Sequence, residues 1–326
     1  MYRKLSYAVT ILIVASLVSL VSGFPGTTGN AAEECDPLGW FPSGYGLKDH
    51  TIFWFDGYYY VAANYIPGEN RFAYGRTQDF CHWEELNPIL DDRLPGTWDE
   101  RAVWAPHVFE EDGNYYMFFT GVKFPFVQSI LLATSTNPAD SSSWMNLGMV
   151  FQPNHAGMVW QPGEWADCRD PMVVKEGDLY YLFYSGQDVE GGIIGYATAT
   201  SLAGPWKDWG KVMPALSKGV MAESPIVVVH NANKYLFYRD TAQGEMVRQS
   251  SQLTGPWQNP EPFAPGWAHE VWQDQSEKWY TSYLTNYSIT IAPLTWDTFF
   301  YPAKPFIGEE VFHTVLPSVL KNSQHR

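Results

Sequence analysis

Residues 49–61 read DHTIFWFDGYYYV: a polar start, a β-branched and aromatic run, an Asp-Gly pair and a second aromatic run. The pattern returns at residues 104–119 (WAPHVFEEDGNYYMFF), 169–184 (RDPMVVKEGDLYYLFY) and 223–238 (ESPIVVVHNANKYLFY), and more weakly at 269–283 (HEVWQDQSEKWYTSY). A short turn sequence such as Asp-Gly between runs of this kind predicts a hairpin of two antiparallel strands. Hairpins that recur every roughly 45 to 65 residues are typical of propeller blades. We therefore predict an all-β fold, a five-bladed β-propeller with a central funnel.

The composition agrees with many short strands joined by turns. Aromatic residues make up 17% of the 326 residues, and there are 27 glycines and 23 prolines. No stretch after residue 24 has a sustained helical period, which argues against a helical fold. Although this length could hold two average domains, one ring uses all of it. We predict a linker at residues 24–39, a single propeller domain at 40–320 and a polar tail at 321–326.

The first residues have the order of a secretory signal peptide. Arg3 and Lys4 precede an apolar run at residues 7–21, and the small residues Ser22 and Gly23 follow. We expect cleavage near residue 23, with residues 30–32 as the alternative. The rival interpretation is an uncleaved anchor, although the run is shorter than the usual span of about 20 residues. The sequence thus predicts a secreted, periplasmic or extracellular protein without a membrane partner after cleavage.

Charge and cysteines narrow the chemistry further. The formal charge is −15, from 20 basic and 35 acidic residues, which disfavours nucleic acid and anionic lipid as partners but suits a neutral sugar. Three cysteines permit at most one intramolecular disulfide, and we expect Cys35 to pair with Cys81. Cys168 is interpreted as a packed thiol because no activating base is paired with it in the sequence. The spacings match no zinc motif.

The residues that begin each inner strand are the candidates for a site. The innermost strand of every blade runs along the central channel, so residues at the same end of these strands lie close together around the channel. Those positions hold Asp49, residues 104–107, Asp170, Glu223 and His269. Strand interiors disfavour Asp, so each carboxylate alone could be a turn residue. Three of them in register across blades favour a site.

Three carboxylates suit the hydrolysis of a glycosidic bond. One carboxyl group protonates the leaving oxygen, and a second either activates water, at a separation of roughly 6.5 to 9.5 Å, or attacks carbon, at about 5 to 5.5 Å. A third carboxylate near the acid raises the acid's pKa by like-charge repulsion. The pattern therefore predicts an active-site funnel.

Three motifs carry a resemblance to a known family. WAPH at residues 104–107 with the following GNYY, RDP at 169–171 and ESP at 223–225 resemble strand-start motifs of glycoside hydrolase family 43, within the wider group of families 43, 32 and 68. The resemblance implies five-bladed, inverting enzymes that act mainly on arabinose- and xylose-containing plant polysaccharides. It implies Asp49 as general base, Asp170 as the residue that tunes the acid and orients the sugar, and Glu223 as general acid.

The resemblance also suggests a metal position. His269 stands where many members have a fifth-blade histidine near a central calcium or water cluster. Calcium prefers oxygen ligands, so a histidine would act through water. We therefore expect no required cofactor and, at most, a structural calcium that His269 holds through water.

Further side chains could bind the sugar. Trp104 could stack on a sugar ring or pack between blades, and His50 and His107 could contact the sugar or be structural. Arg169 could keep Asp170 ionised or pair with Asp167. The loop at residues 151–168 could form a rim with Trp160 and Trp165 as platforms, or pack its own aromatic rings.

Two alternative functions remain at this point. The first is a retaining fructosidase-type hydrolase on the same fold, although those families typically have Asn-Asp-Pro in the first blade and Glu-Cys at the acid. This chain has Lys48-Asp49-His50 and Glu223-Ser224 instead. The second is a non-catalytic propeller that binds carbohydrate or another protein, which the replacement of the family's usual Asp-Pro by Asp49-His50 would fit.

Overall fold

The computed structural model describes residues 35, 38–163, 165–264, 266–297 and 304–307. The predicted signal peptide, most of the predicted linker, the C-terminal limit at 320 and the tail lie outside these residues. The chain divides into two units, 1–36 and 37–326, and the fold below is that of the second. None of the helices among the described residues has the length and apolar character needed to cross a membrane.

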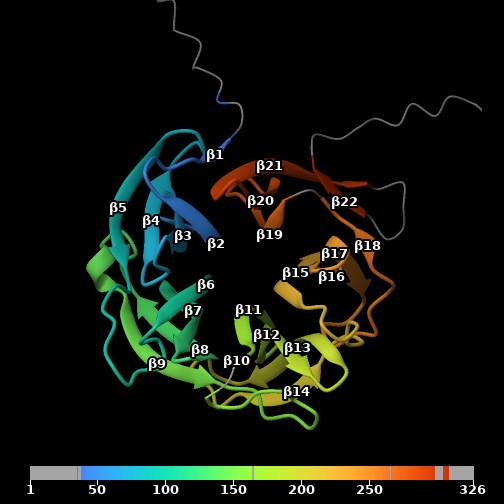
Figure 1. The fold of residues 1–326 in the computed structure, drawn as a ribbon. Helices are drawn as coiled ribbons and strands as arrows, with labels where there is room; N and C mark the ends of the chain where they lie inside the picture. Colours follow the sequence, from blue (N-terminus) through green and yellow to red (C-terminus); the bar gives the residue numbers. More distant parts are fainter. Residues whose placement is uncertain (1–34, 36–37, 164, 265, 298–303, 308–326) are drawn as a thin grey trace, which may run out of the picture. The chain divides into compact units, whose positions relative to one another are not determined.

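The second unit is a ring of five β-sheets, so the predicted five-bladed β-propeller is confirmed (Figure 1). The only helical element in the described part of the chain is a 3-10 turn at Ser141–Ser143. The first blade consists of β2 (Gly46–Phe55), β3 (Tyr58–Ile66), β4 (Phe72–Thr77) and β5 (Trp83–Ile89), and the second of β6 (Ala102–Glu111), β7 (Asn114–Lys123), β8 (Phe126–Ser135), β9 (Met145–Phe151) and β10 (Trp165–Ala166). The third blade consists of β11 (Cys168–Glu176), β12 (Leu179–Asp188), β13 (Gly191–Ala199) and β14 (Lys207–Lys211), and the fourth of β15 (Ala222–His230), β16 (Asn233–Asp240), β17 (Gly244–Ser250) and β18 (Glu261–Pro262). The fifth blade consists of β19 (Trp267–Gln273), β20 (Trp279–Thr285), β21 (Ser288–Asp297), β22 (Lys304–Ile307) and β1 (Gly39–Trp40).

The ring closes by strand pairing between its two ends. β1 pairs antiparallel with β21, with Gly39 opposite Thr290 and Trp40 opposite Ile289. Trp40 also stacks on Trp83 of the first blade, with ring centroids 5.4 Å apart. The start of the ring therefore completes the last blade and contacts the first, which covers sheet edges that would otherwise be unpaired.

The hairpin turns follow from their sequences. Asp56 and Gly57 have φ of 44° and 86°, and Asp112 and Gly113 have φ of 52° and 75°. Two successive residues with positive φ are what the two-residue turn of a twisted antiparallel pair requires, and Asp-Gly adopts this conformation readily. The strong hairpin signals of the sequence are thus confirmed.

Aromatic side chains fill the space between blades. Tyr60, Phe72 and Phe119, from the first two blades, are each 1% exposed or less and belong to one apolar cluster. Burial of a large apolar side chain stabilises the fold by about 1.5–3 kcal/mol. The aromatic runs of the repeat therefore form the interfaces between blades and leave the centre of the ring to the polar strand starts.

The cysteines behave as the sequence suggests. Cys35 and Cys81 are disulfide-bonded, whereas Cys168 is a free and buried thiol. Burial raises the pKa of the Cys168 thiol well above its ordinary value. A thiol that stays protonated is a poor nucleophile, so Cys168 has a packing role.

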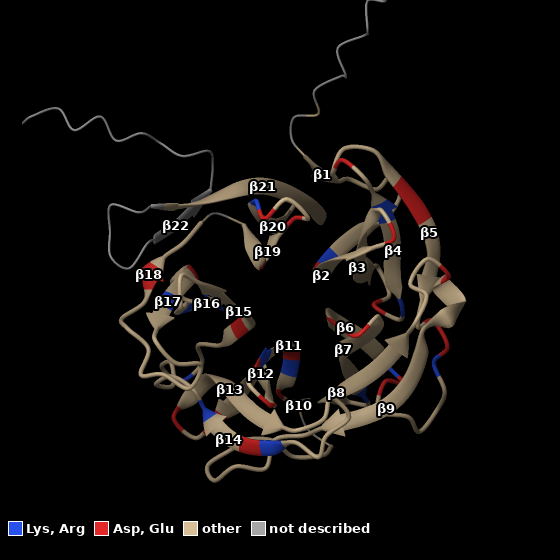
Figure 2. Cartoon of the chain, turned by 180° about the vertical axis from the view of Figure 1, so that it is seen from behind, with Lys and Arg blue, Asp and Glu red and all other residues tan. Residues whose placement is uncertain are grey.

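Each inner strand contains a bulge at the same place. The antiparallel register shifts once near the start of β2, β6, β11, β15 and β19. One residue in each bulge has the left-handed backbone conformation: Asp49, Ala105, Asp170, Ser224 and Ala268, with φ of 27°, 44°, 53°, 50° and 51°. Non-glycine residues rarely adopt this conformation, and bulges re-aim side chains near functional sites. Figure 2 shows that charged positions on β2, β11 and β15 lie at the centre of the ring, where these bulges are.

Candidate active site

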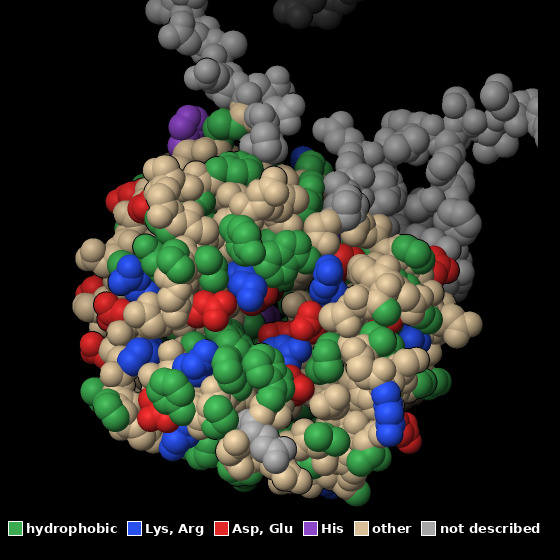
Figure 3. Space-filling view, viewed as in Figure 1, with side chains coloured by type: hydrophobic (Ala, Val, Ile, Leu, Met, Phe, Trp, Pro, Cys, Tyr) green, Lys and Arg blue, Asp and Glu red, His purple; other side chains and the backbone are tan. Residues whose placement is uncertain are grey.

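A cavity of about 530 Å³ lies where the five bulged strands meet. This volume falls in the usual range of small-molecule sites. Figure 3 shows the hollow at the centre of the ring face, bordered by acidic and basic side chains. All five inner strands contribute to its wall, which consists of Lys48, Asp49, Glu69, Trp104, Phe126, Trp165, Arg169, Asp170, Glu223, Ser224, Arg239 and Trp267.

The bulge determines which side chains line this wall. The residue before each left-handed position lines the cavity in every blade: Lys48, Trp104, Arg169, Glu223 and Trp267. The left-handed position itself adds Asp49, Asp170 and Ser224. The structure thus brings together the three carboxylates predicted from the sequence, with Glu223 one bulge position earlier than the two aspartates.

Asp170 is held by neighbours on three blades. Its Oδ2 accepts hydrogen bonds from Ser185 Oγ at 2.9 Å and from the Ser224 backbone N–H at 2.9 Å. Its own backbone N–H donates to Thr120 Oγ1 at 3.0 Å. Burial raises the pKa of Asp170, and the adjacent Arg169 opposes that rise. Asp170 therefore has a fixed orientation beside Glu223.

Asp49 lies on the opposite part of the inner ring, in the first blade. Asn64 Nδ2 donates to its Oδ2 at 3.2 Å, and Asn64 Oδ1 accepts from the Ala105 backbone N–H of the next blade at 2.9 Å. Burial, followed by repulsion from Asp170, raises the pKa of Asp49 to about 7, while Lys48 acts in the opposite direction. A carboxylate with this pKa accepts a proton far more readily than an ordinary aspartate.

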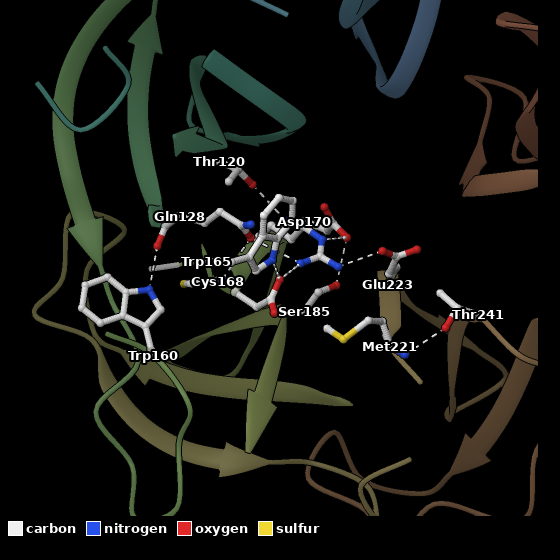
Figure 4. A network of polar contacts seen from close by, with 12 residues as sticks. Thr120, Gln128, Trp160, Trp165, Cys168, Asp170, Ser185, Met221, Glu223 and Thr241 are labelled. Carbon is white, nitrogen blue, oxygen red and sulfur yellow. Dashed lines mark hydrogen bonds and ion pairs between the residues drawn. The ribbon is translucent and has the colours of Figure 1, made fainter. Parts of the chain in front are cut away.

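Glu223 belongs to a network centred on Arg169. Arg169 Nη2 donates to Glu223 Oε1 at 2.7 Å, and Arg169 also pairs with Asp167 and lies 3.7 Å from Asp170 Oδ2. Both contacts considered for Arg169 from the sequence, with Asp167 and with Asp170, are therefore present. Among the dashed contacts in Figure 4 are those that join Trp165 and Glu223 to this network.

Three charged wall residues were not predicted from the sequence as site residues, namely Lys48, Glu69 and Arg239. Glu69 accepts a hydrogen bond from Trp104 Nε1 at 2.8 Å and forms an ion pair with Lys48 Nζ at 3.4 Å. Glu69 lies in the turn between β3 and β4, outside the repeat, so no pattern marked it. Arg239 lies directly opposite Glu223 in the β15–β16 pairing and binds Glu245 at 2.9 Å. Pairing residues outward from the hairpin turn in the sequence could have predicted that Arg239 lies beside Glu223.

The three histidines lie away from the wall of this cavity. His50 is 3% exposed, and its Nε2 forms a hydrogen bond of 2.7 Å with Ser282 Oγ. His107 Nε2 lies 3.3 Å from the Val173 carbonyl oxygen. His50 and His269 line a much smaller space of about 20 Å³ deeper in the channel, whereas His107 lines neither cavity. None of the three is placed to contact a sugar in the larger cavity.

Buried His50 gives a testable stability prediction. Burial, together with nearby His269, lowers the pKa of His50 to about 3, against about 6.5 in an unfolded chain. Between these values the unfolded chain binds a proton that the folded chain does not, so His50 reduces stability as the pH falls below about 6.5. In urea unfolding, the amount by which the free energy of unfolding of His50→Gln falls below that of wild type should shrink by about 1.4 kcal/mol from pH 7.5 to 5.5. A stability difference between the two proteins that does not change with pH would contradict the lowered pKa of His50.

The tryptophans of the rim have different positions. Trp165 lines the cavity and is 57% exposed, whereas Trp160 packs against the apolar core of the second and third blades and donates to the Gln128 carbonyl at 2.8 Å. Of the two platforms expected from the sequence, only Trp165 borders the cavity. Trp104 also lines it, so its ring can contact a ligand.

The calcium expected from the resemblance would lie near His269. His269 Nδ1 shares a 3.0 Å hydrogen bond with Thr281 Oγ1. Within the described ranges, no channel residue belongs to a group of three histidine, cysteine or carboxylate ligand atoms within 4.8 Å of one another. The carboxyl groups of Asp49, Asp170 and Glu270 and the His269 ring all border the narrow deep space. A calcium ion held through water by His269 stays a prediction.

Comparison with known proteins agrees with the fold. The model of glycosyl hydrolases family 43 matches residues 45–161. An arabinoxylan arabinofuranohydrolase of Bacillus subtilis is 23% identical over 225 residues, which is 60% of this chain and 40% of the relative. An extracellular endo-α-(1→5)-L-arabinanase of Thermotoga petrophila is 22% identical over 250 residues, 66% of this chain and 51% of the relative. The chain thus spans about half or less of the length of these relatives.

Solved structures share the fold. An exo-1,5-α-L-arabinanase from a bovine ruminal metagenomic library superposes with a TM-score of 0.60 at 17% identity, covering 81% of this chain and 97% of that one. A Cellvibrio cellulosa α-L-arabinanase in complex with arabinohexaose superposes with a TM-score of 0.63 at 15% identity, covering 81% and 95%. The chain is a family 43-like five-bladed β-propeller, as its strand-start motifs indicate.

Proposed function

We propose that this protein is a secreted glycoside hydrolase that cleaves arabinosyl or xylosyl linkages in plant polysaccharides or oligosaccharides with inversion. The carrying observation is the convergence of Asp49, Asp170 and Glu223, from three blades, on one cavity of a family 43-like propeller. The named activities of the arabinan- and arabinoxylan-degrading relatives support the sugar class.

The positions of the carboxylates suggest their roles. Asp49, whose raised pKa suits proton abstraction, takes a proton from the water that attacks the anomeric carbon. Glu223 donates its proton to the leaving oxygen, and Arg169 then balances the negative charge on Glu223. Asp170, oriented by Ser185 and Ser224, accepts a hydrogen bond from a sugar hydroxyl and adds negative charge beside the acid. No cofactor enters these steps.

The proposed partners and location follow from charge and the N-terminal segment. The net charge of −15 favours a neutral oligo- or polysaccharide over nucleic acid or an anionic membrane. The basic, apolar and small residues at 1–23 have the order of an export signal, so we place the mature protein outside the cell or in the periplasm.

Purified protein that begins after residue 23 tests the function directly. We expect sugar release from arabinan, arabinoxylan or xylo-oligosaccharides. Release from fructan alone would instead favour a fructosidase-type enzyme. No release from any substrate, together with measurable binding of the sugar, would indicate the non-catalytic propeller.

The pH dependence of activity tests the role of Asp49. Because the base must be deprotonated and its pKa is about 7, kcat/KM should fall as the pH drops below about 7. The titratable groups around Asp49 are Lys48, Glu69, Asp170, Glu223 and Glu270. Lys48→Met removes the cation, so it should move this acid limb to higher pH. A limb that stays near pH 4 in both proteins would contradict the assignment.

A further inference from the structure

The cation beside the proposed acid is shared among three carboxylates. Arg169 Nη2 donates to Glu223 Oε1 at 2.7 Å, and Arg169 Nε lies 3.7 Å from Asp170 Oδ2. The third partner is Asp167, whose Oδ1 accepts a hydrogen bond from Arg169 Nη1. Asp167 is 4% exposed and does not line the cavity. Its carboxylate therefore faces the arginine rather than the substrate.

Asp167 has a fixed position behind the wall of the cavity. It lies between β10 and β11, two residues before Arg169. Its Oδ1 also accepts from Trp165 Nε1 at 2.8 Å, and Gln128 Oε1 accepts from Arg169 Nη1 at 3.3 Å. A buried charge is costly unless it is paired and hydrogen-bonded, and Asp167 is both. The sequence thus retains a buried carboxylate whose main partner is the arginine beside the acid.

An arginine this close to a general acid creates a conflict. The acid must carry a proton when the substrate binds, yet a neighbouring cation favours the ionised carboxylate. Burial lowers the pKa of Arg169, but the carboxylates of Asp170, Asp167 and Glu223 outweigh burial and raise that pKa above its ordinary value, so Arg169 stays charged. One positive charge cannot balance three carboxylates. The charge that Arg169 shares with Asp167 and Asp170 is therefore withheld from Glu223.

We infer that Asp167 is a positioning residue for the proposed acid: it shares the Arg169 guanidinium and so lets Glu223 hold its proton more readily. This inference rests on the proposed function and adds a residue outside the cavity to it. Glu223 gives its proton to the leaving oxygen as the bond from that oxygen to the anomeric carbon breaks, and Arg169 pairs with the new carboxylate. When Glu223 takes up a proton from solvent, Asp167 and Asp170 hold the cation.

Other charged groups also surround Glu223 and Asp167. Arg239 lies opposite Glu223 in the β15–β16 pairing and binds Glu245 of β17, while the Cys168 thiol lies near Asp167. A replacement of Asp167 alone leaves these groups in place, so the difference from wild type reports the charge of Asp167. The groups that face Glu223 are Lys48, Asp49, Glu69, Arg169, Asp170, Arg239 and Glu245.

Four variants separate this role from a purely structural one. Asp167→Asn removes the charge but keeps the size of the side chain and an oxygen that can accept from Trp165, and Asp167→Ser is a second variant without the charge. Asp167→Glu keeps the charge. Asp99→Asn is the matched control, because Asp99 is also buried, 2% exposed, and pairs with an arginine, Arg93 at 2.5 Å, but in the loop before β6. All measurements are made below the lowest Tm of the set.

The decisive measurement is the titration of the Glu223 carboxyl group. Carbon NMR of protein labelled at its glutamate carboxyl carbons follows it, and the signal that is missing from Glu223→Gln identifies it. We expect Asp167→Asn and Asp167→Ser to lower the pH at which half of Glu223 is ionised by about 1 unit, because a negative charge one arginine away is lost. Asp167→Glu and Asp99→Asn should stay close to wild type. An unchanged or higher midpoint in both variants without the charge would overturn the inference.

Kinetics then connect the titration to catalysis. Above the midpoint, a shift of one unit leaves about a tenth of the protonated acid, so Asp167→Asn should lower kcat/KM on pentose oligosaccharides about tenfold at alkaline pH and approach wild type at acidic pH. An aryl pentoside, whose leaving group needs little protonation, should lose less. Equal losses at every pH and on both substrates would show that Asp167 only shapes the site, and would overturn its role toward the acid. The expected NMR shift without turnover in wild type would overturn the proposed function alone.

Discussion

Glu223→Gln is expected to lower kcat on arabino- or xylo-oligosaccharides by roughly 100- to 10,000-fold, the contribution of a positioned general acid. The amide keeps the size of the side chain and can still accept a hydrogen bond from Arg169, but it has no proton to give to the leaving oxygen. An aryl pentoside, which needs little protonation, should lose much less activity. Steady-state kinetics on both substrates measure the contrast.

Glu176→Gln is the matched control for this prediction. Glu176 also belongs to an inner strand and forms an ion pair, with Lys234 at 3.0 Å, but it lies at the far end of β11. Its substitution should leave kcat within about twofold of wild type. Unaltered turnover in Glu223→Gln, or an equal loss on the aryl pentoside, would refute the assignment of Glu223 as the acid.

Asp49→Asn is expected to reduce kcat by a similar factor, roughly 100- to 10,000-fold, on every substrate including the aryl pentoside. Activation of water is needed whatever the leaving group, and an amide cannot accept the proton. Asparagine tolerates the left-handed conformation that residue 49 adopts, and its side-chain oxygen can still accept from Asn64. The loss should therefore be chemical rather than structural, which unfolding curves can check.

Asp56→Asn serves as the control in the same blade. Asp56 directly follows β2 in the first hairpin turn and also has a positive φ, of 44°. Asparagine suits that turn, so activity and stability should both stay near wild type. If Asp49→Asn retained full activity on the aryl pentoside, a different residue would have to be the base.

The ring and its three carboxylates could be predicted because they repeat. Each blade is encoded locally, by a hairpin turn between two β-branched or aromatic runs, and the geometry of a propeller then brings strand starts together. The pattern thus predicted that Asp49, Asp170 and Glu223 lie close together, without any knowledge of long-range contacts. The bulge that aims them was not foreseen, since its left-handed residue is Ala or Ser in three blades.

The rest of the site depends on features that do not repeat. Glu69 reaches the wall from the turn between β3 and β4, and its partner Trp104 comes from the next blade. Trp160 and Trp165 lie in the same loop, yet only tertiary packing decides that one is buried and the other borders the cavity. His50 and His107 were expected near the sugar. They follow the left-handed residue of their bulges by one and two positions, and neither lines the larger cavity.

The configuration of the first sugar released tests the central claim most directly. Proton NMR of wild-type protein with a pentose oligosaccharide, recorded before mutarotation, identifies the anomer formed at the cleaved bond. Water activated by Asp49 and protonation by Glu223 predict the inverted anomer from the start of the reaction. Accumulation of the retained anomer first would mean that a carboxylate attacks carbon, and it would contradict the roles assigned to the funnel.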